Sequence, residues 1–303
     1  MRTTPSLAAL GCLVLLTSSG SAQSPPLDTA AIEQASGLKG TFSKEENVFK
    51  ISKPRADVKI AVDGWQMPPF MGLTSWAAFT PAHGGQTMMM GDTVVFEDEI
   101  NPAMSAALEA GLEVTALHNH FVFDQPRVLF MHIGGVGDAA TLAAGVKRVY
   151  DKISEIRAAQ PEPQTAFSGT KVGATNAITA EPLEAILGTK GQAKDGMFKV
   201  VLGRTATMHG TPVGKEMGVN TWAAFAGTDR EAVVDGDFAM IESELQPTLK
   251  TMRSGGLNIV AIHQHMIHEQ PRILFLHYWG TGEAAKLAQS LKTVVDAQTH
   301  FAN

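Results

Sequence analysis

The sequence predicts an α+β protein made of two tandem homologous units, each with a largely antiparallel sheet and flanking helices, related by a pseudo-two-fold axis. Two observations carry this prediction. The chain repeats itself over most of its length, and each repeat places strand-like segments before and between amphipathic helices. Strands followed by mixed elements are typical of α+β folds. A length of 303 residues fits two units of ordinary domain size.

The repeat is clearest around a histidine-rich segment. Residues 118–132 read HNHFVFDQPRVLFMH and residues 263–277 read HQHMIHEQPRILFLH, so eight of fifteen positions are identical at a shift of 145. Upstream, TSWAAF at 74–79 matches NTWAAF at 220–225. The duplication predicts four segments: a signal peptide over 1–22, a first unit over 23–159, a linker over 160–172 and a second unit over 173–303.

Each unit is expected to contain the same elements in the same order. In the first unit we expect helices near 29–36, over 101–110 and from 138, and strands near 48–52, 58–62, 75–80 and 87–96, with two more strands around the histidines. In the second unit we expect helices near 181–187, from 246 and over 283–297. Proline in the first turn and glycine just past the end delimit the middle helix of each unit.

The histidines follow the spacing of a strand. His118 and His120 lie two residues apart in an apolar run, so their side chains project from one face of a strand. A turn of three residues, 125–127, would place His120 directly opposite His132, with roughly 5 Å between their Cβ atoms. The second unit repeats the pattern with His263, His265 and His277. We therefore expect three imidazoles to converge in each unit.

Three converging imidazoles are a typical ligand set for a divalent metal ion that keeps an open position for water or substrate. Zinc is favoured, and the expected activity is that of a metal-dependent, hydrolase-like enzyme. Asp124 and Glu269 share the strand parity of the histidine pairs and are candidate catalytic acid–base residues. Arg127 and Arg272 close the turns and are candidates for binding an anionic substrate.

Two other interpretations stay open at this point. The chain contains 14 methionines, and thioether sulfur is a soft ligand that copper accepts, so a non-catalytic protein that binds or traffics copper is one alternative. The other is a structural or ligand-binding module whose histidines hydrogen-bond internally, because satisfied polar networks rigidify a core. The two units differ in sequence, and we expect the second to carry the better acid–base set.

Charge and cysteine content exclude several classes of function. The formal net charge of −6 leaves no basic surplus to neutralise nucleic-acid phosphates. A single cysteine, Cys12, excludes an internal disulfide framework and a zinc site built from several thiolates.

The first 22 residues are typical of an export signal. Arg2 precedes an apolar run over 7–16, and small residues precede the expected cleavage after Ala22. The run is too short to span a bilayer, and we expect no transmembrane helix elsewhere. The protein is therefore expected in the periplasm or outside the cell. A lipoprotein anchored through Cys12 is the less favoured alternative.

Taken together, these motifs resemble the LppY/LpqO family of exported bacterial proteins, a duplicated domain of unknown function. The resemblance rests on the signal peptide, the duplicated unit, and His-Asn-His or His-Gln-His followed by Asp-Gln-Pro-Arg or Glu-Gln-Pro-Arg and a later histidine. It implies export, as a free or lipid-anchored protein. It implies no established reaction and supplies no catalytic residues.

Overall fold

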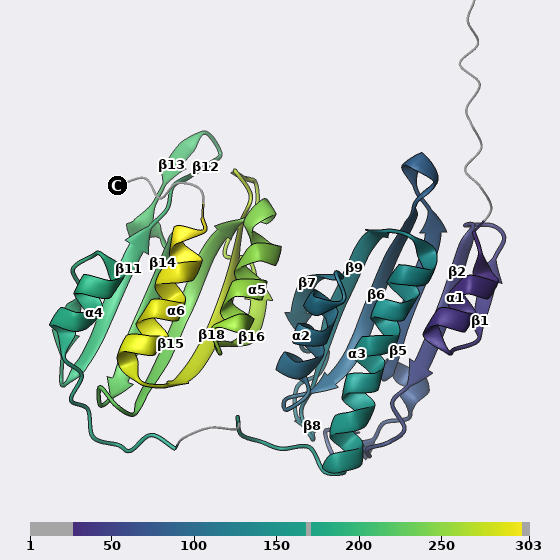
Figure 1. Ribbon diagram of the computed structural model, residues 1–303, viewed down its shortest axis with the longest axis horizontal. Coiled ribbons are helices and arrows are strands. Elements are labelled where there is room, and N and C mark those ends of the chain that lie inside the picture. Colours follow the sequence, from purple (N-terminus) through teal and green to yellow (C-terminus); the bar gives the residue numbers. More distant parts are fainter. Residues whose placement is uncertain (1–26, 168–170, 299–303) are drawn as a thin grey trace, which may run out of the picture.

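The computed structural model describes residues 27–167 and 171–298, so the expected signal peptide and Cys12 lie outside the described residues. The described chain has the predicted α+β fold, with six α-helices packed on an antiparallel sheet. Figure 1 shows two similar units side by side, each with its helices in front of its strands. None of the helices among the described residues is long and apolar enough to cross a membrane.

The first unit runs from α1 to α3. Its elements are α1 (Thr29–Ser36), β1 (Gly40–Ser43), β2 (Val48–Pro54), β3 (Ala61–Val62), β4 (Trp65–Gln66), η1 (Pro69–Met71), β5 (Thr74–Pro81), η2 (His83–Gly85), β6 (Thr87–Phe96), α2 (Ile100–Glu109), β7 (Glu113–His118), β8 (Asp124–Gln125), β9 (Val128–Gly137) and α3 (Ala139–Ala159).

The second unit runs from α4 to α6 and repeats the order of the α-helices and strands. Its elements are α4 (Ala180–Leu187), β10 (Gln192–Lys194), β11 (Met197–Gly203), β12 (Ala206–Met208), β13 (Thr211–Val213), η3 (Lys215–Met217), β14 (Asn220–Gly227), β15 (Ala232–Ile241), η4 (Glu242–Glu244), α5 (Leu245–Ser254), β16 (Asn258–His263), β17 (Glu269–Gln270), β18 (Ile273–Gly282) and α6 (Ala284–Asp296).

Local sequence sets the helix boundaries. The Asp28 side chain accepts a hydrogen bond from the Ala31 N–H and so caps the start of α1. Gly37 ends α1 in the left-handed conformation, with φ of 72°, which glycine adopts without steric cost. Asp138 caps α3 in the same way as Asp28 caps α1, through the Thr141 N–H.

One twelve-stranded sheet joins the two units. Its strand order is β1-β2-β5-β6-β9-β7-β16-β18-β15-β14-β11-β10, and it is symmetric about the central pair β7 and β16. These two strands are antiparallel and meet at Leu117 and Ile262. Each unit also has a small three-stranded sheet, β4-β3-β8 in the first and β13-β12-β17 in the second.

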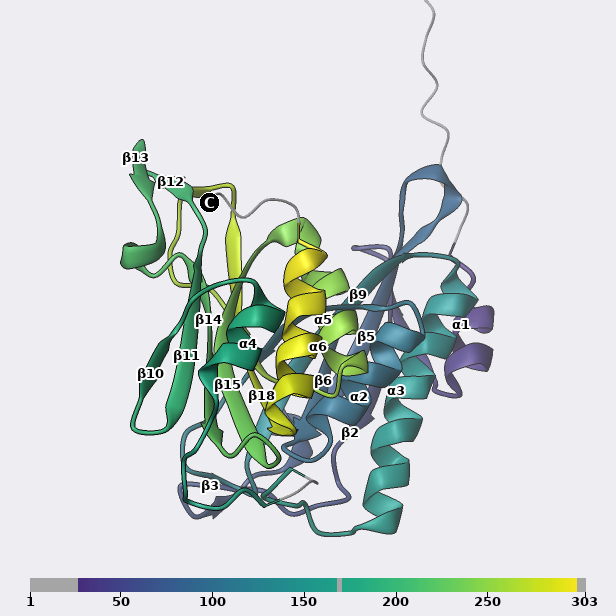
Figure 2. The ribbon, with the colours of Figure 1, turned by 60° about the vertical axis from the view of Figure 1, so that its left-hand side comes forward.

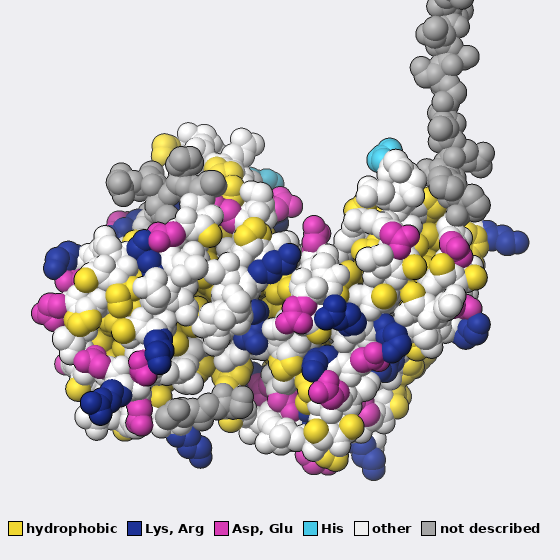
Figure 3. Space-filling view, viewed as in Figure 1, with side chains coloured by type: hydrophobic (Ala, Val, Ile, Leu, Met, Phe, Trp, Pro, Cys, Tyr) yellow, Lys and Arg dark blue, Asp and Glu magenta, His cyan; other side chains and the backbone are white. Residues whose placement is uncertain are grey.

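The helices cover one face of the large sheet, as Figures 1 and 2 show from two directions. Burial alternates along the strands accordingly. In β14, Thr221, Ala223 and Phe225 are buried beneath the helices, whereas Asn220 and Trp222 are partly exposed on the other side. We call this second side the open face. Figure 3, a view of the helix-covered side, shows Lys, Arg, Asp and Glu side chains interspersed and histidine only near the upper rims.

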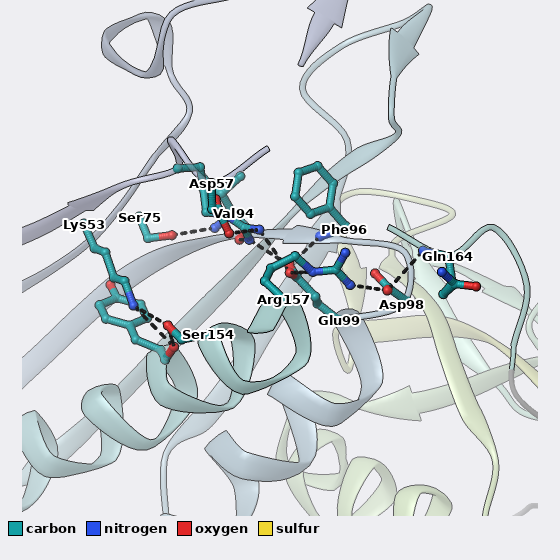
Figure 4. A network of polar contacts seen from close by, with 12 residues as sticks. Lys53, Asp57, Ser75, Val94, Phe96, Asp98, Glu99, Ser154, Arg157 and Gln164 are labelled. Carbon is teal, nitrogen blue, oxygen red and sulfur yellow. Dashed lines mark hydrogen bonds and ion pairs between the residues drawn. The ribbon is translucent and has the colours of Figure 1, made fainter. Parts of the chain in front are cut away.

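A buried ionic network supports the core of the first unit (Figure 4). The Arg55 guanidinium binds both Glu99 carboxylate oxygens, at 2.7 and 3.0 Å. Arg157 of α3 approaches the same carboxylate, with Nε 2.8 Å from Glu99 Oε1, and also pairs with Asp98. In the second unit, Arg204 and Glu244 form the equivalent pair, with the Gln298 amide 3.2 Å from Glu244 Oε2.

Candidate metal centre

Strand register places a tryptophan, an aspartate and a histidine in one row across the open face of each unit. In the second unit, Trp222 pairs with Asp237, and Asp237 pairs with His277. In the first unit, Trp76 pairs with Asp92, and Asp92 pairs with His132. Directly paired residues point to the same side of a sheet. The row therefore brings a carboxylate and an imidazole together in both units.

The other two histidines of each unit gather beside this row. The His263 ring centroid lies 5.1 Å from that of His265 and 4.8 Å from that of His277. In the first unit, the His118 ring centroid lies 5.2 Å from that of His120 and 5.1 Å from that of His132. The six histidines named from the sequence thus form one cluster in each unit.

The predicted pairing of His120 with His132 is wrong. β7 ends at His118, which pairs with Phe130, and His132 pairs with Ala116. The turn is longer than three residues, because the chain leaves the large sheet after His118 and forms β8, which pairs with β3 instead. His120 nevertheless returns to the cluster by stacking on Phe130, with ring centroids 3.3 Å apart. His265 stacks on Phe275 in the same way, at 3.5 Å.

In the second unit, three donor atoms lie at the spacing that a metal ion requires. His263 Nε2 is 3.2 Å from His265 Nε2, and His265 Nε2 is 3.1 Å from Asp237 Oδ2. A tetrahedral ion with bonds of about 2.0–2.1 Å has its ligand atoms roughly 3.3 Å apart. The three residues each offer an atom within 4.8 Å of the others, and could hold a metal ion.

His277 lies beside this group. Its ring stacks on that of His263 at an angle of 5°, and its Nδ1 is 3.2 Å from the Gly236 carbonyl oxygen. Donation from Nδ1 to this carbonyl leaves Nε2 of His277 with a lone pair. His277 is therefore placed to accept a proton next to the Asp237, His263 and His265 group.

Burial sets the protonation of the second cluster. Removal from water, followed by repulsion from the imidazoles of His277 and His265, lowers the pKa of His263 to about 4. His263 is therefore neutral near pH 7, which is the form that binds metals. Burial raises the pKa of Asp237, against the opposing effect of His277 and His265. Asp237 as a residue is only 3% exposed.

Two buried atoms of this group have no hydrogen-bond partner among the described residues. They are Asp237 Oδ1 and His263 Nδ1. Buried polar atoms are nearly always paired, and an orphaned one marks a missing partner or stored strain. A cation at the Asp237 carboxylate would neutralise the buried charge. The residues present thus fit a divalent ion.

The first unit holds the same residue types in a wider arrangement. Asp92 Oδ1 is 4.0 Å from His132 Nε2, and this oxygen is buried without a hydrogen-bond partner among the described residues. Burial is the largest cause of a lowered pKa at His120. The donor atoms of the second unit are closer together, so the second unit is the better candidate.

The candidate acids named from the sequence lie in the turns. Asp124 Oδ2 accepts the Val128 N–H at 2.7 Å, and Glu269 Oε1 accepts the Ile273 N–H at 3.1 Å. Each carboxylate thereby closes the turn that leads into the last strand of its unit. The carboxylate grouped with the histidines is Asp237 instead.

The candidate arginines lie in the same turns, in different surroundings. Arg272 Nη2 donates to Gln264 Oε1 at 2.6 Å. Arg127 lines a cavity of about 720 Å³ that Phe123, Phe167 and His118 also line. Arg127 is thus open to a ligand, and Arg272 already braces the loop that carries the histidines.

Sequence reasoning missed Asp92 and Asp237 as site residues. Their signal is the duplicated pair Gly91-Asp92 and Gly236-Asp237, in which an aspartate recurs at the same place in two largely apolar strands. A charged side chain that is buried in a strand requires a partner. Only the register, which pairs each aspartate with a histidine, identifies that partner.

The second cluster opens to solvent through a cavity of about 480 Å³, lined by Asp237 and His265 together with Lys199, Lys215 and Trp222. Ligand cavities for small molecules have volumes of roughly 300–1,000 Å³. A small molecule can therefore reach the candidate metal ligands.

Comparison with known proteins places this chain in a family. The family model described as Domain of Unknown Function (DUF1259) matches residues 30–152 and again residues 181–297. The chain belongs to this family. The double match confirms the internal repeat, and the family description gives no function. The LppY/LpqO name is not part of this match and stays an expectation.

The other two comparisons add little. No curated protein matches the chain. A solved structure, that of a trimeric bacterial microcompartment shell protein, PduB, is 11% identical, with 84% of this chain and 89% of that chain covered. Its TM-score is 0.20, which is too low to support an argument about fold or function.

Proposed function

We propose that this is an exported protein whose second unit binds a divalent metal ion through Asp237, His263 and His265, and that it acts as a metal-dependent hydrolase. The observation that supports the metal site is the spacing of the donor atoms, 3.2 Å between the two imidazole nitrogens and 3.1 Å from imidazole to carboxylate. The orphaned Asp237 Oδ1 points to the same conclusion.

The ligand set favours zinc. Two neutral imidazoles and one carboxylate are nitrogen and oxygen donors, and zinc sites of catalytic type use three such ligands. The same set also suits ferrous iron, so both metals belong in the test. A divalent ion held in this way supplies Lewis acidity and lowers the pKa of bound water to about 7.

The protein's own residues would supply the remaining functions. Asp237 anchors the site with its charge, and His265 is held in place by stacking on Phe275. His277 Nε2 would accept a proton, since the Gly236 carbonyl already binds Nδ1. We assign this role to His277 and not to Glu269, whose Oε1 accepts the Ile273 N–H and which is not grouped with the histidines.

Metal analysis of matched variants tests the site. Purified protein, loaded separately with zinc, iron and copper, is measured by mass spectrometry of its metals. We expect about one zinc or iron per chain, lost in Asp237→Asn and retained in Asp92→Asn, which changes the equivalent aspartate of the first unit. Protein without metal, and with no uptake on adding zinc or iron, would overturn the proposal.

Copper binding without catalysis is the second candidate. It is favoured by Met88 and Met90, which are 40% and 60% exposed on the face of β6 that carries Asp92. Soft thioether ligands suit Cu(I). If this function is correct, Met90→Leu will weaken Cu(I) binding in a competition titration, and Asp237→Asn will not. Equal effects of the two changes would exclude a first-unit copper site.

Export has its own test. We propose that residues 1–22 direct export and are cleaved after Ala22, so a reporter fused to them should appear outside the cytoplasm with a shortened N-terminus. Cys12→Ala distinguishes an ordinary cleaved signal peptide from a lipoprotein signal, in which Cys12 would carry the lipid. Export and cleavage that are unchanged in this variant support a free protein, and lost processing supports a lipoprotein.

A further inference from the structure

The cavity beside the candidate metal ligands carries two cationic side chains. Lys199 of β11 and Lys215 of η3 line it, together with Asp237 and His265. Trp222 lies in the same lining and adds an aromatic surface. Charged and apolar groups thus surround a space of about 480 Å³.

Lys199 is held over the tryptophan. Its Nζ lies 4.2 Å from the Trp222 ring centroid, a cation–π contact. Within the described residues, Lys199 has no carboxylate at ion-pair distance. The ring fixes the ammonium group at the cavity without neutralising it. An anion that enters the cavity meets an available positive charge.

The stem of Lys215 lies close to Gly203 of β11. At Gly203, a Cβ atom would lie 2.9 Å from Lys215 Cβ, so the glycine makes room for this side chain over β11. The carboxylate nearest to its ammonium group is that of Glu216, 3.9 Å away and with its side chain 91% exposed. Such a surface pair contributes little and is screened by salt. The charge of Lys215 therefore remains available to a ligand.

The first unit has the lysine on tryptophan but not the second cation. Lys50 Nζ lies 4.2 Å from the Trp76 ring centroid, as Lys199 does from Trp222. The segment that matches Lys215-Glu216-Met217 is Pro69-Phe70-Met71, and Phe70 is 96% exposed. The two units thus share the lysine over the tryptophan, and Lys215 has no lysine counterpart in the first unit. The paired lysines occur in the unit with the closer metal ligands.

The geometry points to a small organic oxyanion, a carboxylate or a phosphate, as the substrate class of the second unit. Its charged group lies at Lys199 and Lys215, and its apolar part lies beside Trp222, within reach of Asp237 and His265. This inference rests on the proposed function, because it names the substrate of that same metal site. A metal ion at Asp237 adds further positive charge, so a neutral ligand of the same size is discriminated against.

Calorimetric titration of the purified, zinc-loaded protein tests the inference with three probes. Phenyl phosphate and benzoate distinguish the two oxyanions, and benzyl alcohol is the neutral control of similar shape. We expect one or both anions to bind and benzyl alcohol not to bind. Lys199→Gln and Lys215→Gln should each weaken anion binding about tenfold, the usual effect of losing one charge-assisted hydrogen bond. Lys50→Gln, the matched change in the first unit, should leave it unchanged.

Two results would overturn the inference: equal affinity for benzyl alcohol and the anions, or anion binding that neither lysine variant weakens. Metal content is measured on the same preparations, so the two proposals can fail separately. Metal binding without lysine-dependent anion binding removes this inference alone. Lysine-dependent anion binding by a protein that takes up no metal removes the hydrolase proposal and retains an anion site. Thermal unfolding of each variant verifies that it is folded.

Discussion

The side-chain amide of Asn101 hydrogen-bonds both backbone groups of Ile259, donating to the carbonyl at 3.2 Å and accepting the N–H at 2.8 Å. Gln246 does the same for Val114, at 2.8 and 3.0 Å. Both strands are irregular directly after these residues. On the side where β7 and β16 face each other, the described strands pair at Leu117 and Ile262 alone, so neither Ile259 nor Val114 has a strand partner there. Each unit thus supplies the amide that completes a strand of the other.

Asn101→Ala should lower the free energy of unfolding by about 1–3 kcal/mol, because the buried backbone groups of Ile259 lose their partners. Gln246→Ala should have a similar effect through Val114. Urea denaturation measures both. Asn119→Ala is the control, since the Asn119 amide is exposed and bonds within its own loop to Phe121. If Asn101→Ala is as stable as this control, the hydrogen bonds between Asn101 and Ile259 do not stabilise the contact between the two units.

Glu99→Ala should be the most damaging change in the first unit. It leaves the guanidinium groups of Arg55 and Arg157 buried without the carboxylate that both of them contact. Loss of one partner from a buried ion pair costs about 3–5 kcal/mol. Lys147→Ala, which breaks an exposed pair with Asp151, should change stability by less than about 1 kcal/mol. Urea denaturation measures both variants. Equal denaturation midpoints for Glu99→Ala and Lys147→Ala would show that the buried ion pairs stabilise the fold no more than the exposed one.

Acid should destabilise the metal-free protein through His263. Because its folded-state pKa is about 4, below the ordinary value of 6.5, the unfolded chain binds a proton between these pH values that the folded chain does not. Stability therefore falls as the pH is lowered through this window. Asp237, whose pKa is raised, acts in the opposite sense, so the comparison is made in an Asp237→Asn background.

In that background, denaturation is measured with a chelator at pH 6.5 and pH 4.5. We expect the added change His263→Gln to make the difference in stability between the two pH values smaller. The reverse result, a larger difference with glutamine, would show that His263 is not held in its neutral form.

Glu269→Gln should reduce stability without changing metal content. Glu269 is 6% exposed and accepts the Ile273 N–H, so its charge supports the turn before β18. A hydrogen bond from a backbone donor to a charged acceptor contributes about 1.5–3 kcal/mol, and glutamine retains part of it. Metal analysis and thermal unfolding check the two statements. Lost metal in this variant, with stability unchanged, would restore Glu269 as a site residue.

Much of the fold could be predicted from local sequence patterns, each of which occurs in both units. The predicted helix near 29–36 coincides with α1, and the strand expected over 87–96 coincides with β6. Proline and glycine mark the ends of α2 and α5 because they act on the backbone locally. The short edge strands β1 and β10 were missed, since none of their residues is buried and their hydrophobic pattern is weak.

The site was harder to predict because it depends on register. The histidines could be grouped from their spacing, although His120 reaches its cluster through Phe130 and not through strand pairing. Asp237 comes from a strand far along the chain from His263, and no local pattern joins them. β15, which carries Asp237, and β16, which ends at His263, pair with opposite edges of β18, and these long-range pairings bring the two residues together.

The exchanged amides of Asn101 and Gln246 have a consequence for the origin of the chain. A unit of this kind cannot complete its own irregular strand, so a solitary copy would need a second copy in contact with it. Covalent fusion converts that encounter between molecules into one within a molecule, at an effective concentration in the millimolar range. Because fused units are always in contact, they need not be identical, and the residues of each site can diverge independently.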